Sequence, residues 1–272
     1  MSGVAGRCFF QIQGRSSLTR LAGCSGKRAS TSRSQASGSL LVEVGNAEKD
    51  YFQDILLLAV SREAPGLVFK GGTALFKLHG LDRFSEDLDF TGRLTGPEVL
   101  RLARYVDDFG YPADATVREA GGGLLASYGI QGLLYQGTPR SMARVRLDAS
   151  WKDEVSVTTE WRTYFPMYGD APSFRIQAMV VEEILAEKVR ALLHRRKSRD
   201  AYDVWFLLNK GIRADESVLK RKLSLYGEKL SKGSLESALA TISKRWRGEL
   251  RPMVTNLPEF GEVSAALKKR LL

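Results

Sequence analysis

The sequence predicts an α+β fold, with a short mixed sheet and helices followed by a helical C-terminal part. Residues 46–63 and 97–109 carry apolar side chains at the helical period. Short segments that are apolar, or that alternate between apolar and polar residues as strands do, occupy residues 67–70, 87–91 and 143–149. From Ala178 onward the pattern is mostly helical.

The composition allows a sizeable core, because 43% of the 272 residues are hydrophobic. No apolar run approaches the roughly 18 residues of a membrane-spanning helix, so no membrane partner is expected. Both cysteines, Cys8 and Cys24, lie near the N-terminus, which leaves none for a disulfide framework or a thiolate zinc site in the rest of the chain. This usage suits a reducing compartment, and we expect a cytoplasmic protein.

Charge divides the chain into three parts. Residues 1–38 contain six basic and no acidic residues and are rich in Ser and Gly, which predicts a disordered basic tail. An organelle-targeting segment and a misassigned start are the alternatives for this tail. Residues 39–178 are expected to form the core. Residues 179–272 are expected to form a helical, basic region, since residues 213–272 carry 13 basic and 7 acidic residues.

The elements of the core begin with a helix over residues 46–63. Asn46 is its candidate N-cap, and acidic residues follow in the first turn. Residues 67–70 form a short apolar strand. The Gly-Gly pair 71–72 then turns the chain into a brief helix over residues 73–79.

The next strand covers residues 87–91. Two-residue periodicity places Asp87 and Asp89 on one face of it and apolar side chains on the other. A proline at the first helical position opens a helix over residues 97–109. Residues 124–136 read as one strand, or as two strands separated at a glycine.

Paired aspartates are the first chemical feature of the core. Two carboxylates on one strand face repel each other, and a divalent cation removes that conflict. Mg²⁺ is the expected ion because it combines a few carboxylates with phosphate oxygens, and Mn²⁺ is the alternative. Asp148, on the polar face of strand 143–149, is the candidate third ligand. Asp87, Asp89 and Asp148 together allow two ions, which hold the attacking and leaving oxygens of a phosphoryl transfer.

The start of the brief helix is the candidate phosphate-binding site. Backbone N–H groups at a helix N-terminus attract phosphate, and glycine lets the phosphate come close. The candidates there are Gly71, Gly72 and Thr73. Arg83 either contacts phosphate or anchors its loop, and Ser85 either bonds a γ-phosphate or stabilises a turn.

Each feature alone has an ordinary structural explanation. A Gly-Gly pair before a helix is usually only a turn, and an Asp-x-Asp pair is usually a solvent-facing strand edge. Their combination in the order strand, turn, helix, strand and later strand favours a nucleotide and metal site. A purely structural helical adaptor would leave these elements without a purpose.

A distal helix adds a basic residue. Lys188 lies beside an apolar stripe over residues 181–192. A lysine there either extends along the surface or reaches into a polar cleft, where a triphosphate is a suitable partner. On the next helix, Arg199 and Asp203 fit an i,i+4 ion pair, and Asp200 is a second candidate for holding an arginine.

Four separated blocks resemble the AbiEii/MenT group of nucleotidyltransferases. In order, between about residues 47 and 208, they are EKDYFQDILL, KGGTAL, GLDRFSEDLDF and EEILAEKVRALLHRRKSRDAYDVWFLL. The resemblance implies a polymerase-beta-like nucleotidyltransferase core with a helical C-terminal part. It also implies that Asp87 and Asp89 bind metal. Lys188 would be the essential basic residue, and Asp203 the distal catalytic acid.

These features predict an Mg²⁺-dependent nucleotidyltransferase that joins a nucleotide from an NTP to an acceptor hydroxyl. Some members of the family are toxins that add nucleotides to the tRNA acceptor end. The resemblance therefore implies a toxin-type enzyme, the 3′ end of tRNA or another RNA as acceptor, and a cognate antitoxin as partner.

The basic C-terminal region is the expected RNA-docking face, and its binding should be sensitive to salt. The candidate phosphate contacts are Lys220, Arg221, Lys222, Lys244, Arg245 and Arg247. Two alternatives to RNA modification remain open. One is transfer to a hydroxyl of a protein or small molecule, and the other is a regulator that binds RNA or nucleotide without turnover.

Overall fold

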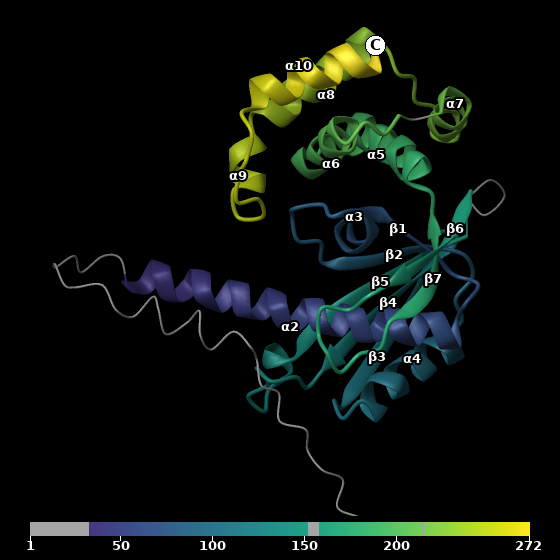
Figure 1. Cartoon of the computed structure of the whole chain (residues 1–272), viewed down its shortest axis with the longest axis vertical. Coiled ribbons are helices and arrows are strands. Elements are labelled where there is room, and N and C mark those ends of the chain that lie inside the picture. Colours follow the sequence, from purple (N-terminus) through teal and green to yellow (C-terminus); the bar gives the residue numbers. More distant parts are fainter. Residues whose placement is uncertain (1–32, 152–157, 214) are drawn as a thin grey trace, which may run out of the picture. The chain divides into compact units, whose positions relative to one another are not determined.

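The computed structural model describes residues 33–151, 158–213 and 215–272. Within them, the part from Glu43 to Leu272 forms one compact unit built on a seven-stranded sheet (Figure 1). None of the helices in these ranges is long and apolar enough to cross a membrane. The expected α+β fold is confirmed.

The sheet is mixed, and its strands lie in the spatial order β3-β4-β5-β2-β1-β7-β6. Neighbours are antiparallel except for the parallel pairs β2 with β5 and β1 with β7. In chain order the strands are β1 (Val68–Lys70), β2 (Asp87–Thr91), β3 (Ala113–Ala120), β4 (Gly123–Ile130), β5 (Ala143–Ser150), β6 (Thr159–Tyr164) and β7 (Phe174–Met179).

Helices connect the early strands and make up most of the chain after the sheet. They are α2 (Arg33–Glu63), α3 (Gly71–His79), α4 (Gly96–Asp108), the 3₁₀ turn η1 (Pro139–Ser141), α5 (Val181–Arg195), α6 (Ser198–Asn209), α7 (Glu216–Ser224), α8 (Lys232–Ser243), α9 (Trp246–Leu250) and α10 (Phe260–Leu271). Helices α5 to α10 lie together, and α3 lies between them and the sheet, in contact with β2 and α5 (Figure 1).

The strand that carries the paired aspartates lies at the centre of the sheet, between β1 and β5. Leu88 and Phe90 are fully buried in the core, while Asp87 and Asp89 point to the opposite face. The alternation therefore sets the side on which the carboxylates emerge. The structure confirms both the predicted strand and the prediction that Asp87 and Asp89 share one of its faces.

Several boundaries differ from the prediction. α2 begins at Arg33, so Asn46 lies inside the helix and is not its N-cap. The segment before Asn46 contains no proline, and the local cap signal does not stop the helix. Residues 1–32 of the expected tail lie outside the described residues, and residues 33–38 form the first turns of α2. Residues 124–136 contain one strand, β4, which ends at Ile130.

Candidate active site

A cleft of about 210 Å³ lies between the sheet and α5. This volume is several times the roughly 30 Å³ share of one water molecule, so it accommodates a small ligand and not only an isolated ion. Its polar and charged lining comes from the sheet, from α5 and from the turn after α7. These residues are Lys70, Asp89, Asp148, Ser150, Glu187, Lys188, Arg190, Arg195 and Tyr226.

Two predicted metal ligands form the acidic part of this lining. Asp89 of β2 and Asp148 of β5 are register partners on adjacent parallel strands, and both side chains line the cleft. Lys70 of β1 is the register partner of Asp89 on its other side. The sheet register therefore places two carboxylates and one ammonium group side by side.

Burial raises the pKa of Asp89 to about 6. Lys188 and Lys70 oppose this rise in pKa, whereas the carboxylates of Asp148 and Asp87 add to it. Burial also raises the pKa of Asp148, with Lys70 opposing the change. The cleft thus holds two carboxylates that are costly to keep ionised without a further positive charge.

Asp87, the third predicted ligand, has a different partner. Arg146 of β5 donates from Nε to Oδ1 at 2.8 Å and from Nη2 to Oδ2 at 3.1 Å, and Asp87 is not part of the cleft lining. The part of the chain that the structure describes contains no group of three or more His, Cys, Asp or Glu side chains placed to hold a metal ion. A third carboxylate would therefore require Asp87 to leave Arg146.

The Gly-Gly pair makes room for side chains of the neighbouring strand and loop. Gly71 has φ +76°, and a Cβ atom there would overlap the carboxylate of Asp89. A Cβ atom on Gly72 would lie 2.8 Å from Ser85 Oγ and 3.1 Å from Arg83 Nη2. The close approach of the aspartate strand thus explains the glycine at position 71, and the close approach of the loop before that strand explains the glycine at position 72.

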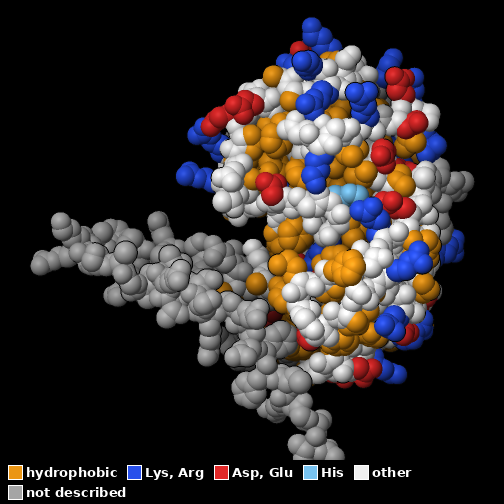
Figure 2. All heavy atoms as spheres, in the orientation of Figure 1, with side chains coloured by type: hydrophobic (Ala, Val, Ile, Leu, Met, Phe, Trp, Pro, Cys, Tyr) orange, Lys and Arg blue, Asp and Glu red, His pale blue; other side chains and the backbone are white. Residues whose placement is uncertain are grey.

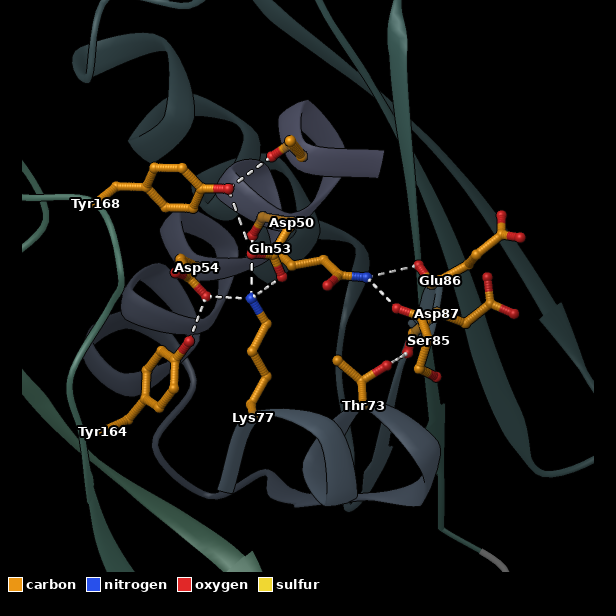
Figure 3. Close-up of polar contacts among 11 residues, drawn as sticks. Asp50, Gln53, Asp54, Thr73, Lys77, Ser85, Glu86, Asp87, Tyr164 and Tyr168 are labelled. Atoms are coloured by element: carbon orange, nitrogen blue, oxygen red, sulfur yellow. Dashed lines mark hydrogen bonds and ion pairs between the residues drawn. The ribbon is translucent and has the colours of Figure 1, made fainter. Parts of the chain in front are cut away.

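The loop before Asp87 is held from two helices (Figure 3). Gln53 of α2 donates from Nε2 to the carbonyl oxygens of Ser85 at 2.8 Å and Glu86 at 2.9 Å. The Thr73 hydroxyl of α3 donates to the Asp87 carbonyl at 2.5 Å. Thr73 is buried and is occupied by this bond, so its hydroxyl fixes the start of β2.

A buried ion cluster joins α2 to α3 beside this loop (Figure 3). Lys77 Nζ lies 2.5 Å from both Asp50 Oδ1 and Asp54 Oδ1. Tyr164 donates its hydroxyl to the same Asp54 oxygen at 2.8 Å. Burial raises the pKa of Asp54, although Lys77 opposes the change. The cluster sets the position of α3, and with it the position of Gly71 under Asp89.

The distal motif forms a second buried ion cluster. Arg83 donates to Asp203 from Nε at 2.7 Å and from Nη2 at 2.6 Å, and Lys188 Nζ lies 2.8 Å from Asp203 Oδ2. Asp203 is 0% exposed and is not part of the cleft lining, whereas Lys188 is. Burial alone would raise the pKa of Asp203, but Lys188 and Arg83 hold that pKa below its usual range.

This arrangement decides two questions that the sequence left open. Arg83 anchors its loop, because its guanidinium group is buried against Asp203. Asp203 pairs with Arg83 and Lys188, so an ion pair with Arg199, the structural alternative that the spacing allowed, does not account for Asp203. Asp200 holds an arginine as anticipated, with its Oδ1 atom 3.1 Å from Arg195 Nη2.

A third cluster connects the cleft with α7. Lys222 Nζ lies 2.9 Å from Glu183 Oε1 and 3.0 Å from Glu187 Oε1, both on α5. Glu187 Oε1 also lies 3.5 Å from Lys70 Nζ in the cleft. Burial would raise the pKa of Glu187, but Lys70 and Lys222 hold that pKa below its usual value. The prediction that Lys222 is an RNA contact is wrong, because its side chain is buried and neutralised.

The other predicted RNA contacts are exposed, and acidic partners lie beside Lys220, Arg245 and Arg247. The closest distances are 3.3 Å between Lys220 and Glu216, 3.8 Å between Arg245 and Glu249, and 2.8 Å between Arg247 and Glu259. Arg221 and Lys244 are also exposed. Figure 2 shows acidic side chains scattered among the basic ones over the C-terminal helices. Acidic side chains thus partly neutralise the positive charge of the C-terminal helices, which were expected to bind RNA.

Lys222 and Lys220 allow a matched test on one helix. Lys222→Met is expected to lower the free energy of unfolding by about 3 kcal/mol, because Glu183 remains buried without its cation. Lys220, whose side chain is 79% exposed, should change stability by less than about 0.5 kcal/mol when replaced by Met. Urea unfolding of both variants measures the difference, and equal stabilities would contradict the buried role of Lys222.

Several residues of the cleft were not predicted from the sequence. Lys70, Glu187, Arg190 and Tyr226 line it without having been singled out. For Lys70 a signal exists, since it is the last residue of a strand directly before the Gly-Gly turn. For Tyr226 there is none, because its approach to the cleft depends on how α7 packs against α5.

Comparison with known proteins agrees with this geometry. The family model described as "Nucleotidyl transferase AbiEii toxin, Type IV TA system" matches residues 55–269. No match to the chain was found among curated proteins.

Among solved structures, MenT4, a nucleotidyltransferase toxin from Mycobacterium tuberculosis, is 23% identical with a TM-score of 0.58, over 84% of this chain and 82% of that one. JHP933 from Helicobacter pylori is 16% identical with a TM-score of 0.58, over 83% and 90%. A putative nucleotidyltransferase from H. pylori is 17% identical with a TM-score of 0.53, over 82% and 91%. At these identities the three structures show a shared fold. With the family model covering most of the chain, the protein belongs to the AbiEii family of nucleotidyltransferase toxins of type IV toxin–antitoxin systems.

Proposed function

We propose that the protein transfers a nucleotide from an NTP to the 3′ end of an RNA, and that this RNA is a tRNA. The observation that carries the proposal is the pairing of Asp89 and Asp148 on adjacent strands, with Lys188 across the same cleft. In the reaction the acceptor 3′ oxygen attacks the α-phosphorus, and the bond from that phosphorus to the β-phosphate oxygen breaks. Pyrophosphate leaves, and the hydroxyl proton passes to solvent.

The two cleft carboxylates fit a Mg²⁺ site, because Mg²⁺ is usually bound by one or two carboxylates together with substrate phosphates. Gly71 supports this fit, since it leaves space for the Asp89 carboxylate that any other residue would fill. When bound, the ion neutralises phosphate charge and stabilises the transition state. Asp87 is the proposed additional ligand once it is released from Arg146.

The cationic residues of the cleft bind and orient the triphosphate in this proposal. Lys188 is held by Asp203 and borders the cleft, and Lys70 lies beside Asp89. Asp203 acts as a positioning residue that fixes Lys188. Gly71 and Gly72 offer backbone N–H groups at the start of α3. Ser85, next to Gly72, is the proposed hydroxyl donor to phosphate.

An assay with labelled nucleotides tests this function. The protein is incubated with total RNA and each α-labelled NTP, with Mg²⁺ or with a chelator. Label should appear on tRNA-sized RNA, should require the metal, and should disappear when the RNA is first oxidised with periodate, which destroys the terminal 2′,3′-diol. Label on RNA that survives periodate treatment would contradict 3′-end transfer.

One observation favours a second acceptor class. Lys222 is buried, and exposed cations such as Arg247 are paired with carboxylates, so the C-terminal helices offer less free positive charge than the sequence suggested. Transfer to a hydroxyl of a protein or small molecule is the candidate that this observation supports. In the same assay it would place the label on protein or in the small-molecule fraction.

A further inference from the structure

The cleft ends at an aromatic side chain that the transfer chemistry does not use. Tyr226 follows α7, lines the cleft and is 42% exposed. The guanidinium carbon of Arg190 lies 3.9 Å from the centre of its ring, which is a face-on stacking distance. An exposed aromatic ring beside a phosphate-binding cleft calls for an explanation beyond packing.

Arg190 differs from the other cations of the cleft in its partners. Lys188 and Arg195 are paired with carboxylates of α6, and Lys70 with Glu187. Among the residues that the structure describes, Arg190 forms no ion pair within 4.0 Å. Its charge contributes, after Lys70 and Lys222, to lowering the pKa of Glu187, and its close contact is the tyrosine ring. Its planar guanidinium group and the ring form one stacked surface at the edge of the cleft.

The turn that carries the ring has a fixed backbone. Tyr226 N donates to the Leu223 carbonyl at 3.1 Å, and Glu228 N donates to the same carbonyl at 3.0 Å. Glu228 Oε1 lies 3.1 Å from His194 Nδ1 on α5. The Lys222 cluster fixes α7 to α5 one turn earlier. These contacts fix the backbone of the turn, and the stack on Arg190 restrains the ring itself, so the ring loses less freedom when a ligand stacks on it.

We propose that Tyr226, backed by Arg190, is the platform on which the base of the donor NTP stacks, an inference that rests on the proposed function. Lys188 and Arg190 are two residues apart on α5, about 3 Å along the helix axis, and both line the cleft together with Tyr226. A nucleotide with its phosphates at Lys188 and the aspartates can therefore place its base on the ring. Stacking on an aromatic face accepts every base. The platform therefore adds affinity for a nucleoside without choosing among the four NTPs.

Calorimetry with full-length protein separates base stacking from phosphate binding. The probes are Mg²⁺ complexes of the four α,β-methylene NTPs and of inorganic tripolyphosphate, which lacks a base. Tyr226→Ala should weaken binding of all four nucleotides roughly tenfold or more and leave tripolyphosphate binding unchanged. Tyr226→Phe should bind like the wild type, because it keeps the ring. Phe165→Ala, at a 71% exposed aromatic outside the cleft lining, is the matched control.

Any other result of these binding measurements contradicts the stacking role of Tyr226, and the pattern of results shows which part of the proposal fails. Equal weakening of nucleotide and tripolyphosphate binding would mean that Tyr226 acts on the phosphate site and not on the base. Unchanged nucleotide binding together with weaker RNA binding would assign the ring to the acceptor. If the wild type binds neither probe, the proposed function itself fails. If it binds nucleotide and Tyr226→Ala has no effect, only the platform is wrong.

Discussion

Asp89→Asn is expected to abolish nucleotide transfer and, without ligand, to make the protein more stable. Loss of the carboxylate removes charge that the proposed reaction requires, and we expect activity to fall on the order of 10³-fold. Stability should rise because ionised Asp89 is unfavourable in the folded state, where its pKa is about 6 and its ordinary value is 3.8. The difference corresponds to at most about 3 kcal/mol at neutral pH.

The gain in stability of the Asp89→Asn variant should increase with pH. The folded protein binds the Asp89 proton more tightly than the unfolded chain does, so this carboxyl costs nothing below about pH 4. The loss of folding stability caused by ionised Asp89 grows between the ordinary pKa of 3.8 and the folded pKa of about 6, and it is constant at higher pH. Melting temperatures of wild type and Asp89→Asn should therefore agree near pH 4 and diverge towards pH 7.5, with the variant higher.

Two controls accompany this experiment. Asp107→Asn, at an exposed position in the last turn of α4, should change neither activity nor the pH dependence. Mg²⁺ with NTP should stabilise the wild type and not the Asp89 variant, since ligand binding favours the folded state that binds it. A variant that melts below the wild type at pH 7.5 would show that Asp89 supports the fold instead of opposing it.

The strand that carries Asp89 was predictable because its signals are local. Alternation over residues 87–91 fixes which side chains are buried, and a later strand with the same alternation contains Asp148. That the two carboxylates meet depends on the parallel pairing of β2 with β5. The pattern cannot specify this pairing, and Asp148 was a candidate only because the opposite face of its own strand is apolar.

Other strands were missed for different reasons. β3 and β6 are the two edges of the sheet and show weak alternation, because edge strands bury fewer residues. β7 does alternate, with Phe174, Ile176 and Ala178 buried, so its signal was present but short. Its parallel pairing with β1 joins segments more than 100 residues apart in the sequence.

Burial of charged residues was the least predictable property of the site. Lys222 is spaced three and four residues from Leu219 and Val218, which places it on the partly buried face of α7, whereas Lys220 points outward. That spacing was available from the sequence. The partner of Asp203 was not, because Arg83 lies 120 residues earlier and no periodicity links the two.

Asp203→Asn is expected to lower the free energy of unfolding by about 3 to 5 kcal/mol, the largest loss of stability among these variants. The change removes one negative charge and leaves the buried guanidinium of Arg83 with a neutral amide. Chemical denaturation measures the loss. Glu216→Gln, at an exposed ion pair with Lys220, is the control and should cost less than about 1 kcal/mol.

A double-mutant cycle shows whether the loss comes from the buried pair. Arg83→Met alone should also be destabilising, since it removes the main partner of Asp203. Arg83→Met combined with Asp203→Leu should be less damaging than the single changes Arg83→Met and Asp203→Leu added together, because neither Arg83 nor Asp203 is then left as an unpaired charge. Lys188 loses Asp203 in the single Asp203→Leu variant and in the double variant alike, and it keeps Asp200 at 3.6 Å. Additive losses would mean that the two residues stabilise the fold independently.

A further substitution of Asp203 distinguishes a positioning role from a catalytic one. If Asp203 only fixes Lys188, then a variant that keeps the charge, Asp203→Glu, should retain part of the activity, and the activity lost should appear mainly as a higher KM for NTP. A residue that touches the reacting atoms would instead lower kcat with KM unchanged. Because Asp203 is fully buried behind Lys188 and outside the cleft lining, we expect the effect on KM.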